Sequence, residues 1–181
     1  VGLWDRYYSN KQDRQMYGDP TTAEKAGKFL NQPDIRNIED WGCGQGGFRD
    51  YIGKHQTYIG IDGSQTQFAD KIADLEAYRS QVDAIHVRHI LEHNPGWRNI
   101  LRNALASFQK RMVLTLFTPF IGETKFIAVY PQFTGLDIMM VDIAFARDDI
   151  VGHFEGIRWH SEEGLVTETQ YKIEHVFYLQ K

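Results

Sequence analysis

Four glycines stand within six residues in the first third of the chain, directly after a short strand-like run. The stretch from Ile38 to Gly47 reads Ile-Glu-Asp-Trp-Gly-Cys-Gly-Gln-Gly-Gly, and residues 48–52 favour a helix. Because glycine adopts backbone angles that other residues avoid, this pattern predicts a tight strand-to-helix turn. A ligand can approach such a backbone closely and face the free N–H groups at the start of a helix.

Two ligand chemistries fit the spacing of these glycines. Gly42, Gly44 and Gly47 match G-x-G-x-x-G, which binds the pyrophosphate of a dinucleotide. Gly42, Gly44 and Gly46 also match G-x-G-x-G, and Asp40 precedes them by two residues. An acid beside the loop attracts an ammonium group and repels a pyrophosphate. The glycine loop alone is also compatible with any tight strand-helix turn.

A second acid ends the next predicted strand, Thr57–Asp62, and Gly63 and Ser64 follow it. Asp62 lies about 20 residues beyond the loop, where a ribose-binding carboxylate is expected. The next strand-like run, Asp70–Leu75, begins only a short segment later. A full crossover connection needs about a dozen residues, so we expect the third helix to be a single turn or absent.

Histidines cluster after the predicted strand Gln81–Arg88, where the chain reads His-Ile-Leu-Glu-His from His89 to His93. This matches H-x-x-E-H, a zinc-protease signature, in which both histidines would share a helix face. No clear third ligand accompanies them, so we expect activity without a metal. Among these histidines, His89 is the strongest functional candidate because it directly follows the end of the strand. We expect His93 to bond to a nearby backbone group or carboxylate, and His86 to point into the sheet packing.

These residues need a sheet that brings several strand ends together. The predicted strands are Asn37–Trp41, Thr57–Asp62, Asp70–Leu75, Gln81–Arg88, Arg111–Phe117, Ile157–Ser161 and Tyr171–Leu179, with strand-like pieces at Lys125–Tyr130 and Ile138–Ile143. The predicted helices are Thr21–Leu30, one from the glycine loop to Gly53, one from Pro95 and one at Asp148–Phe154, after an aromatic arm at residues 3–8 and 16–18. Five βα units and a terminal strand pair predict an open, mostly parallel α/β sheet. The last strand alternates like an exposed antiparallel edge.

Composition narrows the class of protein. A length of 181 residues suits one domain, and a net charge of −4 argues mildly against binding a phosphate backbone. The lone cysteine, Cys43, excludes an internal disulfide. No apolar run approaches 18 residues and no signal peptide opens the chain, so we expect a cytoplasmic protein that needs no membrane.

Three blocks of the sequence resemble the class I S-adenosylmethionine (SAM) methyltransferases. Glu39–Gly46 looks like their first motif, and Gly60–Ser64 looks like their second. Val82–Ile85 followed by Leu91–His93 resembles the fourth-strand block of the small-molecule branches. The blocks agree in order and spacing over residues 38–117, and the rest matches only in layout.

The resemblance implies a Rossmann-like fold, with a seven-stranded doubly wound sheet and an antiparallel C-terminal strand. It also implies a single methyltransferase domain over residues 1–181. Residues 1–33 would form an arm and a helix, residues 34–117 the cofactor-binding half and residues 118–181 the acceptor-side half.

The resemblance also implies SAM as cofactor and assigns roles to residues. The glycines would admit the methionine and ribose parts, Asp40 the amino end, Asp62 the ribose hydroxyls, and Asp74 with Leu75 the adenine edge. Arg88 and His89 would lie near the methyl group, and His89 would be the catalytic base for a hydroxyl acceptor. The full set of cofactor residues so implied is Asp40, Trp41, Gly42, Gly44, Gly46, Asp62, Gly63, Ser64, Asp74, Leu75 and Arg88.

We therefore expect methyl transfer to oxygen or nitrogen of a small polar acceptor, such as a metabolite, a natural product or a sugar-like molecule. The chain lacks the Asp/Asn-Pro-Pro-Tyr/Phe block of DNA methylases, so we do not expect DNA as a partner. The alternatives are a non-catalytic SAM-binding protein, an RNA or peptide methyltransferase, and a nicotinamide oxidoreductase. The acidic residue before the loop disfavours the last of these. An acceptor pocket has six candidate wall residues: Trp4, Tyr7, Tyr17, Trp97, Tyr130 and Phe133.

Overall fold

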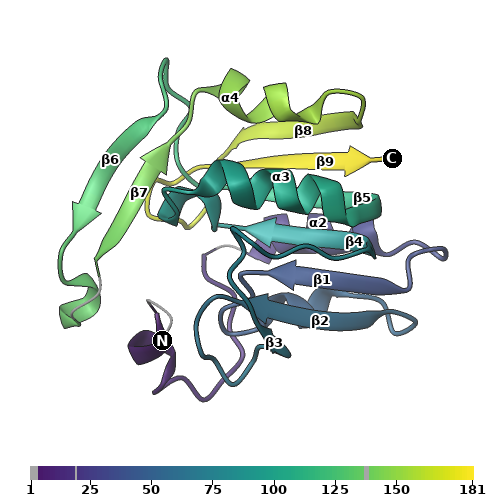
Figure 1. Cartoon of the computed structure of the whole chain (residues 1–181), viewed down its shortest axis with the longest axis horizontal. Helices are drawn as coiled ribbons and strands as arrows, with labels where there is room; N and C mark the ends of the chain where they lie inside the picture. Colours follow the sequence, from purple (N-terminus) through teal and green to yellow (C-terminus); the bar gives the residue numbers. More distant parts are fainter. Residues whose placement is uncertain (1–3, 19, 137–138) are drawn as a thin grey trace.

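The computed structural model describes residues 4–18, 20–136 and 139–181, so Leu3 of the predicted arm and Ile138 of a predicted strand lie outside it. Its main element is a seven-stranded sheet with the strand order β3-β2-β1-β4-β5-β9-β8 (Figure 1). Strands β1 to β5 run parallel, and β9 is antiparallel to both of its neighbours. The predicted mostly parallel, seven-stranded sheet with an antiparallel C-terminal strand is confirmed.

The parallel strands lie close to where the sequence placed them. They are β1 (Asn37–Trp41), β2 (Thr57–Asp62), β3 (Lys71–Ile72), β4 (Val82–Arg88) and β5 (Phe108–Leu116). Strands that are covered on both faces tend to have nearly continuous apolar sequences, so their positions can be predicted from the sequence. The prediction for β3 was too long, because this exposed edge strand has only two residues in the ladder.

The prediction of an exposed C-terminal edge strand is wrong. β9 (Glu174–Gln180) lies between β5 and β8 (Arg158–Leu165), and all of its residues except the last are buried. β9 itself begins with two adjacent polar residues, Glu174 and His175, and continues with apolar and aromatic residues to Leu179. Glu174 and His175 are nevertheless buried, because neighbouring elements supply polar partners for them.

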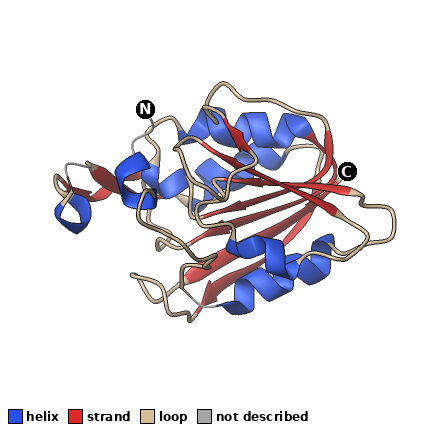
Figure 2. Cartoon of the chain, turned by 90° about the horizontal axis from the view of Figure 1, so that it is seen from below, coloured by secondary structure: helices blue, strands red, loops and turns tan. Residues whose placement is uncertain are grey.

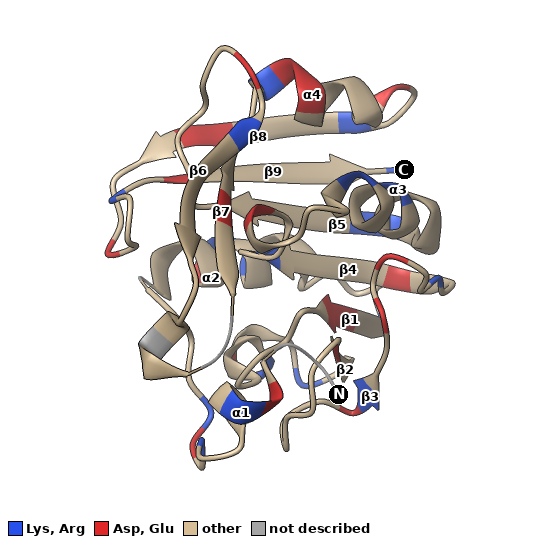
Figure 3. Cartoon of the chain, turned by 60° about the vertical axis from the view of Figure 1, so that its left-hand side comes forward, with Lys and Arg blue, Asp and Glu red and all other residues tan. Residues whose placement is uncertain are grey.

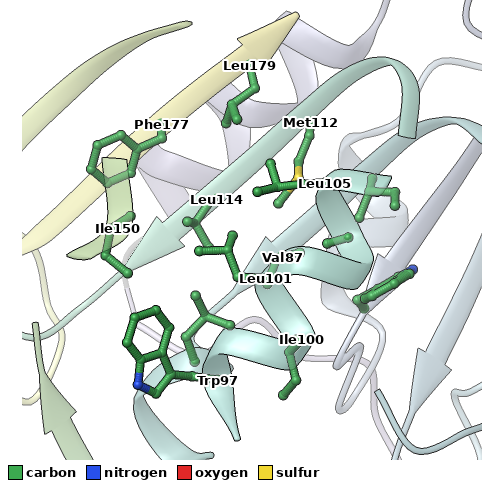
Figure 4. Packing of buried hydrophobic residues seen from close by; sticks show 14 of the residues in the cluster. Val87, Trp97, Ile100, Leu101, Leu105, Met112, Leu114, Ile150, Phe177 and Leu179 are labelled. Carbon is green, nitrogen blue, oxygen red and sulfur yellow. The ribbon is translucent and has the colours of Figure 1, made fainter. Parts of the chain in front are cut away.

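Helices cover both faces of the sheet (Figure 2). On one face, α2 (Pro20–Leu30) packs its apolar residues against β1, β4, β5 and β9. On the other, α3 (Trp97–Ser107) and α4 (Arg147–Val151) enclose the larger core, in which Leu101 and Leu105 pack against Met112 and Leu114 (Figure 4).

The expectation of five βα units is wrong. Within the described residues, the only parallel crossover that contains an α-helix is the one between β4 and β5. The glycine loop leads into a short 3-10 helix, η1 (Gly47–Tyr51), and not into a helix that reaches Gly53. So few residues do not repay the cost of nucleating an α-helix. The third helix is absent from the described residues, which agrees with the short segment after Asp62.

Two further segments flank the carboxyl end of the parallel strands. The hairpin of β6 (Lys125–Tyr130) and β7 (Met140–Ala144) forms a separate two-stranded sheet there (Figure 1). The short helix α1 (Asp5–Tyr8) of the N-terminal arm lies at the same end (Figure 3). Among the helices that the structure describes, none has the length and apolar character needed to cross a bilayer.

Gly27 tests how tightly α2 packs onto η1. A Cβ on Gly27 would lie 2.4 Å from the carbonyl oxygen of Tyr51. Alanine normally stabilises a helix by about 1 kcal/mol over glycine, whereas overpacking costs about 1–3 kcal/mol. Because the contact is with backbone, we expect Gly27→Ala to lower the free energy of unfolding in urea. The control is Lys28→Ala on the exposed face of α2, and equal stability of the two variants would contradict this packing.

Candidate functional site

A cavity of about 510 Å³ opens at the carboxyl ends of β1, β2 and β4. Small-molecule sites have volumes of about 300–1,000 Å³. Most of the site residues that the sequence predicted line this cavity: Asp40, Gly42, Gly44, Asp62, Gly63, Ser64, Asp74, Leu75, Arg88 and His89. Trp41 and Gly46 are not in the wall: the Trp41 ring is buried and donates to Glu39, and Gly46 bridges to Gln15.

The glycine loop needs its glycines for two reasons. Gly42, Gly44 and Gly46 have φ values of +73°, +53° and +67°, a region that side chains disfavour. The loop is also crowded by the protein itself: a Cβ on Gly47 would lie 2.6 Å from the backbone of Gln15. The loop therefore admits the N-terminal arm on one side and leaves Gly42 and Gly44 at the cavity.

Asp62 holds the two loops of the site together. Its Oδ2 accepts the N–H of Gly44 at 2.9 Å, and its Oδ1 accepts the N–H of Ser64 at 2.8 Å. Burial raises the pKa of Asp62, and these backbone hydrogen bonds oppose the rise. Each oxygen keeps a further lone pair, so the carboxylate is oriented without being saturated.

Asp40 is also bonded within the protein. It accepts a hydrogen bond from the Tyr58 hydroxyl at 2.6 Å and lies 2.7 Å from His86 Nδ1. The His86 ring stacks on Phe48 and lines the cavity, while its Nε2 is buried without a hydrogen-bond partner. His86 is therefore buried in the packing of the sheet, as expected, and it also lines the cavity.

Asp74 and Leu75 form a turn that also lines the cavity. Asp74 Oδ1 accepts the N–H of Glu76 at 2.9 Å, and the Asp74 carbonyl accepts the N–H groups of Ala77 and Tyr78. The carboxylate thus stabilises the turn, and its second oxygen is not used in that turn.

Arg88 and His89 converge on Glu174, a buried carboxylate of β9. Arg88 Nη2 lies 2.8 Å and His89 Nε2 lies 2.6 Å from the same Glu174 oxygen. The other oxygen accepts from Thr22 of α2. Burial lowers the pKa of His89 well below its ordinary value, and the positive charge of Arg88 adds to this, so the ring is neutral near pH 7. His89 Nδ1 is buried without a partner.

The H-x-x-E-H segment does not form the helix that zinc ligation would need. His89 has a positive φ of 56°, and only Leu91–His93 form a 3-10 helix, η2. His93 Nδ1 bonds to the Val141 carbonyl, away from Glu174, which holds His89. Among the described residues, no group of three or more His, Cys, Asp or Glu side chains is arranged to hold a metal ion.

Aromatic rings enclose one side of the cavity. Trp4, Tyr7, Tyr17 and Phe133 line it as the sequence suggested, whereas Trp97 is a core residue and Tyr130 is not in the wall. The wall residues that the sequence did not predict include Tyr8, Phe117 and Ile90. Phe117 directly follows a strand end, which is the signal that could have identified it. Nothing in the sequence near Glu174 indicates its contact with Arg88.

The charges around the cavity favour a cationic ligand. Four carboxylates line it, those of Asp40, Asp62, Asp74 and Glu76. Arg88 is the only Lys or Arg among the described wall residues, and Glu174 opposes its charge. Acidic groups in a partly dry cleft raise the local concentration of positive charge.

Glu92 makes the stability of this edge depend on pH. Its Oε1 accepts the N–H of Phe117, its Oε2 has no partner, and burial raises its pKa from 4.5 to about 7. When the pKa of an acid is higher in the native state than in the unfolded state, its contribution to stability is fully present below the unfolded-state pKa. The contribution is lost as the pH rises through the native-state pKa. The free energy of unfolding of Glu92→Gln, relative to that of the wild type, should therefore increase by up to roughly 3 kcal/mol between about pH 5 and 8. Urea unfolding of both proteins across that range measures it, and a constant difference would contradict it.

Comparisons with known proteins place the chain by its fold. No protein-family model matches the sequence, and no curated protein matches it. One similar structure is 1,6-didemethyltoxoflavin-N1-methyltransferase of Burkholderia thailandensis with S-adenosylhomocysteine bound: TM-score 0.67, 13% identity, 90% of this chain and 79% of that one. Magnesium protoporphyrin IX methyltransferase of Synechocystis PCC 6803 with SAM bound gives a TM-score of 0.64 at 15% identity over 99% and 90%.

A third match is the glycopeptide N-methyltransferase MtfA complexed with SAM, with a TM-score of 0.62 at 10% identity over 95% of this chain and 97% of that one. Because the sequence identities are this low, the structural matches establish only that the fold is shared. The chain has the fold of the class I SAM-dependent methyltransferases, as its three sequence blocks implied.

Proposed function

We propose that the protein is a SAM-dependent methyltransferase that acts on a small polar acceptor, and that residues 1–181 form its single methyltransferase domain. The observation that carries the proposal is the bond between Gly44 of the glycine loop and Asp62, in the wall of a cavity of about 510 Å³. A loop of this kind, joined to an acid at the end of the next strand, suits a ligand with a ribose.

The residues in the cavity wall fit the chemistry of SAM. Asp62 has lone pairs left for two ribose hydroxyls, and Asp74 with the Leu75 backbone offers polar groups for an adenine edge. Asp40 supplies negative charge for an ammonium group. The acidic wall also suits the positive sulfonium, whereas a dinucleotide would bring its pyrophosphate toward Asp40.

The chain mainly has to hold and shield the reactants. SAM, when bound, supplies an activated methyl group, so positioning of the acceptor accounts for most of the catalysis. The N-terminal arm contributes by covering the site: the Trp4 N–H donates to Ser64, and Arg88 binds the Tyr17 carbonyl. The assignment of His89 as the base stays a prediction, and its Nε2 is held by Glu174.

The size and wall of the cavity support a small acceptor with a flat apolar part. Trp4, Phe117 and Phe133 offer aromatic faces or edges in the cavity wall. The similar structures include enzymes of small molecules, namely didemethyltoxoflavin and magnesium protoporphyrin IX.

Replacing Asp62 tests the cofactor assignment. Asp62→Ala removes the acceptor of the ribose hydroxyls, so we expect S-adenosylhomocysteine binding to weaken by about 1–3 kcal/mol in titration calorimetry. The matched control is Asp83→Ala. Asp83 also accepts two backbone N–H groups, those of Arg36 and Asn37, but at the opposite end of β4.

The control separates binding from folding, because both variants lose a carboxylate that holds two backbone groups. Asp83→Ala should bind S-adenosylhomocysteine as the wild type does. Equal binding by Asp62→Ala and wild type, or no binding by the wild type, would refute the proposed cofactor site. Binding of NAD in its place would favour an oxidoreductase.

A further inference from the structure

Three histidines line the cavity, and two of them are occluded. His86 and His89 have side chains that are 2% and 8% exposed, and each has one ring nitrogen on a carboxylate. Their second nitrogens, His86 Nε2 and His89 Nδ1, are buried and without partners. Neither ring therefore presents a nitrogen to a molecule that enters the cavity.

His93 differs from both. Its side chain is 20% exposed, and its Nδ1 lies 2.9 Å from the Val141 carbonyl oxygen. A carbonyl only accepts hydrogen bonds, so Nδ1 must carry the proton, and in the neutral ring Nε2 keeps a free lone pair. Among the described residues none bonds to Nε2, which is not one of the buried unpartnered atoms. The structure thus leaves one accessible proton acceptor on an imidazole in the cavity.

The surroundings of His93 connect it to both halves of the site. Its ring lies 5.9 Å from Trp4 and 5.4 Å from Phe117, measured between centroids. The Trp4 backbone N–H in turn donates to Ser64, which follows Asp62. A single tryptophan therefore spans the distance from the proposed ribose end of the cavity to His93. The aromatic rings beside His93 suit an acceptor built on a flat ring.

We propose that His93 is the catalytic base that takes the proton of a hydroxyl group on a small aromatic acceptor, so that the reaction is an O-methylation. The inference rests on the proposed function and specifies its acceptor. It assigns the proton transfer to a different histidine from the one that the sequence favoured.

The step balances without another reactant. The acceptor oxygen forms a bond to the methyl carbon as its proton passes to His93 Nε2, and the electron pair of the broken C–S bond stays on sulfur. The ring becomes an imidazolium, and the proton leaves to water after the products dissociate.

Asp142 acts as a positioning residue for that imidazolium. Its Oδ1 lies 3.2 Å from His93 Nδ1, and its Oδ2 accepts from the Tyr171 hydroxyl at 2.7 Å. Burial alone would lower the pKa of His93, but the bonds to Asp142 and Val141 and the nearby Glu92 carboxyl outweigh it, and the pKa is raised. The ring is therefore the neutral base only above this raised pKa, and Asp142→Asn should move that threshold to lower pH.

Nitrogen NMR of histidine-labelled protein, saturated with S-adenosylhomocysteine, tests the proposal. His93→Gln and His89→Gln assign the two rings. We expect a protonated Nδ1 and an unprotonated Nε2 for neutral His93. Phenol should shift the Nε2 resonance, and toluene, which has the same ring without a hydroxyl, should not. Phenol should bind about 2- to 10-fold more weakly to His93→Gln, the value of one hydrogen bond, while toluene binding stays equal.

The control variant is His160→Gln, an exposed histidine of β8 outside the cavity wall, which should leave both ligands unaffected. A protonated Nε2 in the neutral ring, equal responses to phenol and toluene, or a response at His89 alone would each overturn the role of His93. Failure of wild type to bind S-adenosylhomocysteine would instead overturn the proposed function, so the two failures are distinguishable.

Discussion

One hydrogen bond, from the Gly44 N–H to Asp62, determines the shape of the site. It ties the glycine loop after β1 to the end of β2, and the Ser64 N–H completes the hold on the same carboxylate. Because both loops depend on one buried acid, the cavity wall is preformed before a ligand arrives. The positive φ angles of the glycines are needed for the loop to reach this acid without strain.

A row of buried contacts to carboxylates extends this constraint across the α2 face of the sheet. His86 lies 2.7 Å from Asp40, and Glu174 forms an ion pair with Arg88 and a hydrogen bond with His89. Breaking a buried pair is costly because one charge is left without a partner. Each of these groups therefore holds its neighbour in place. The bonding polar atoms are then not available for proton transfer.

The surroundings of His93 are built differently, from elements that lie outside the main sheet. The hairpin strand β7 supplies the Val141 carbonyl, which bonds to His93, and the Asp142 carboxylate, which lies 3.2 Å from the same ring; the N-terminal arm supplies Trp4. The cavity thus combines one accessible histidine nitrogen with polar groups that are held by bonds within the protein.

The sequence by itself determined where the parallel strands lie and which residues mark their ends, because glycine spacing and apolar runs are local signals. It predicted Asp40, Asp62 and Asp74 in one wall, since parallel strands end at one edge. Only the tertiary structure decided which histidine nitrogen is accessible. That depends on partners far away in the chain: Glu174 lies 85 residues from His89, and Val141 lies 48 from His93. No local pattern records such contacts, because packing of separate elements creates them.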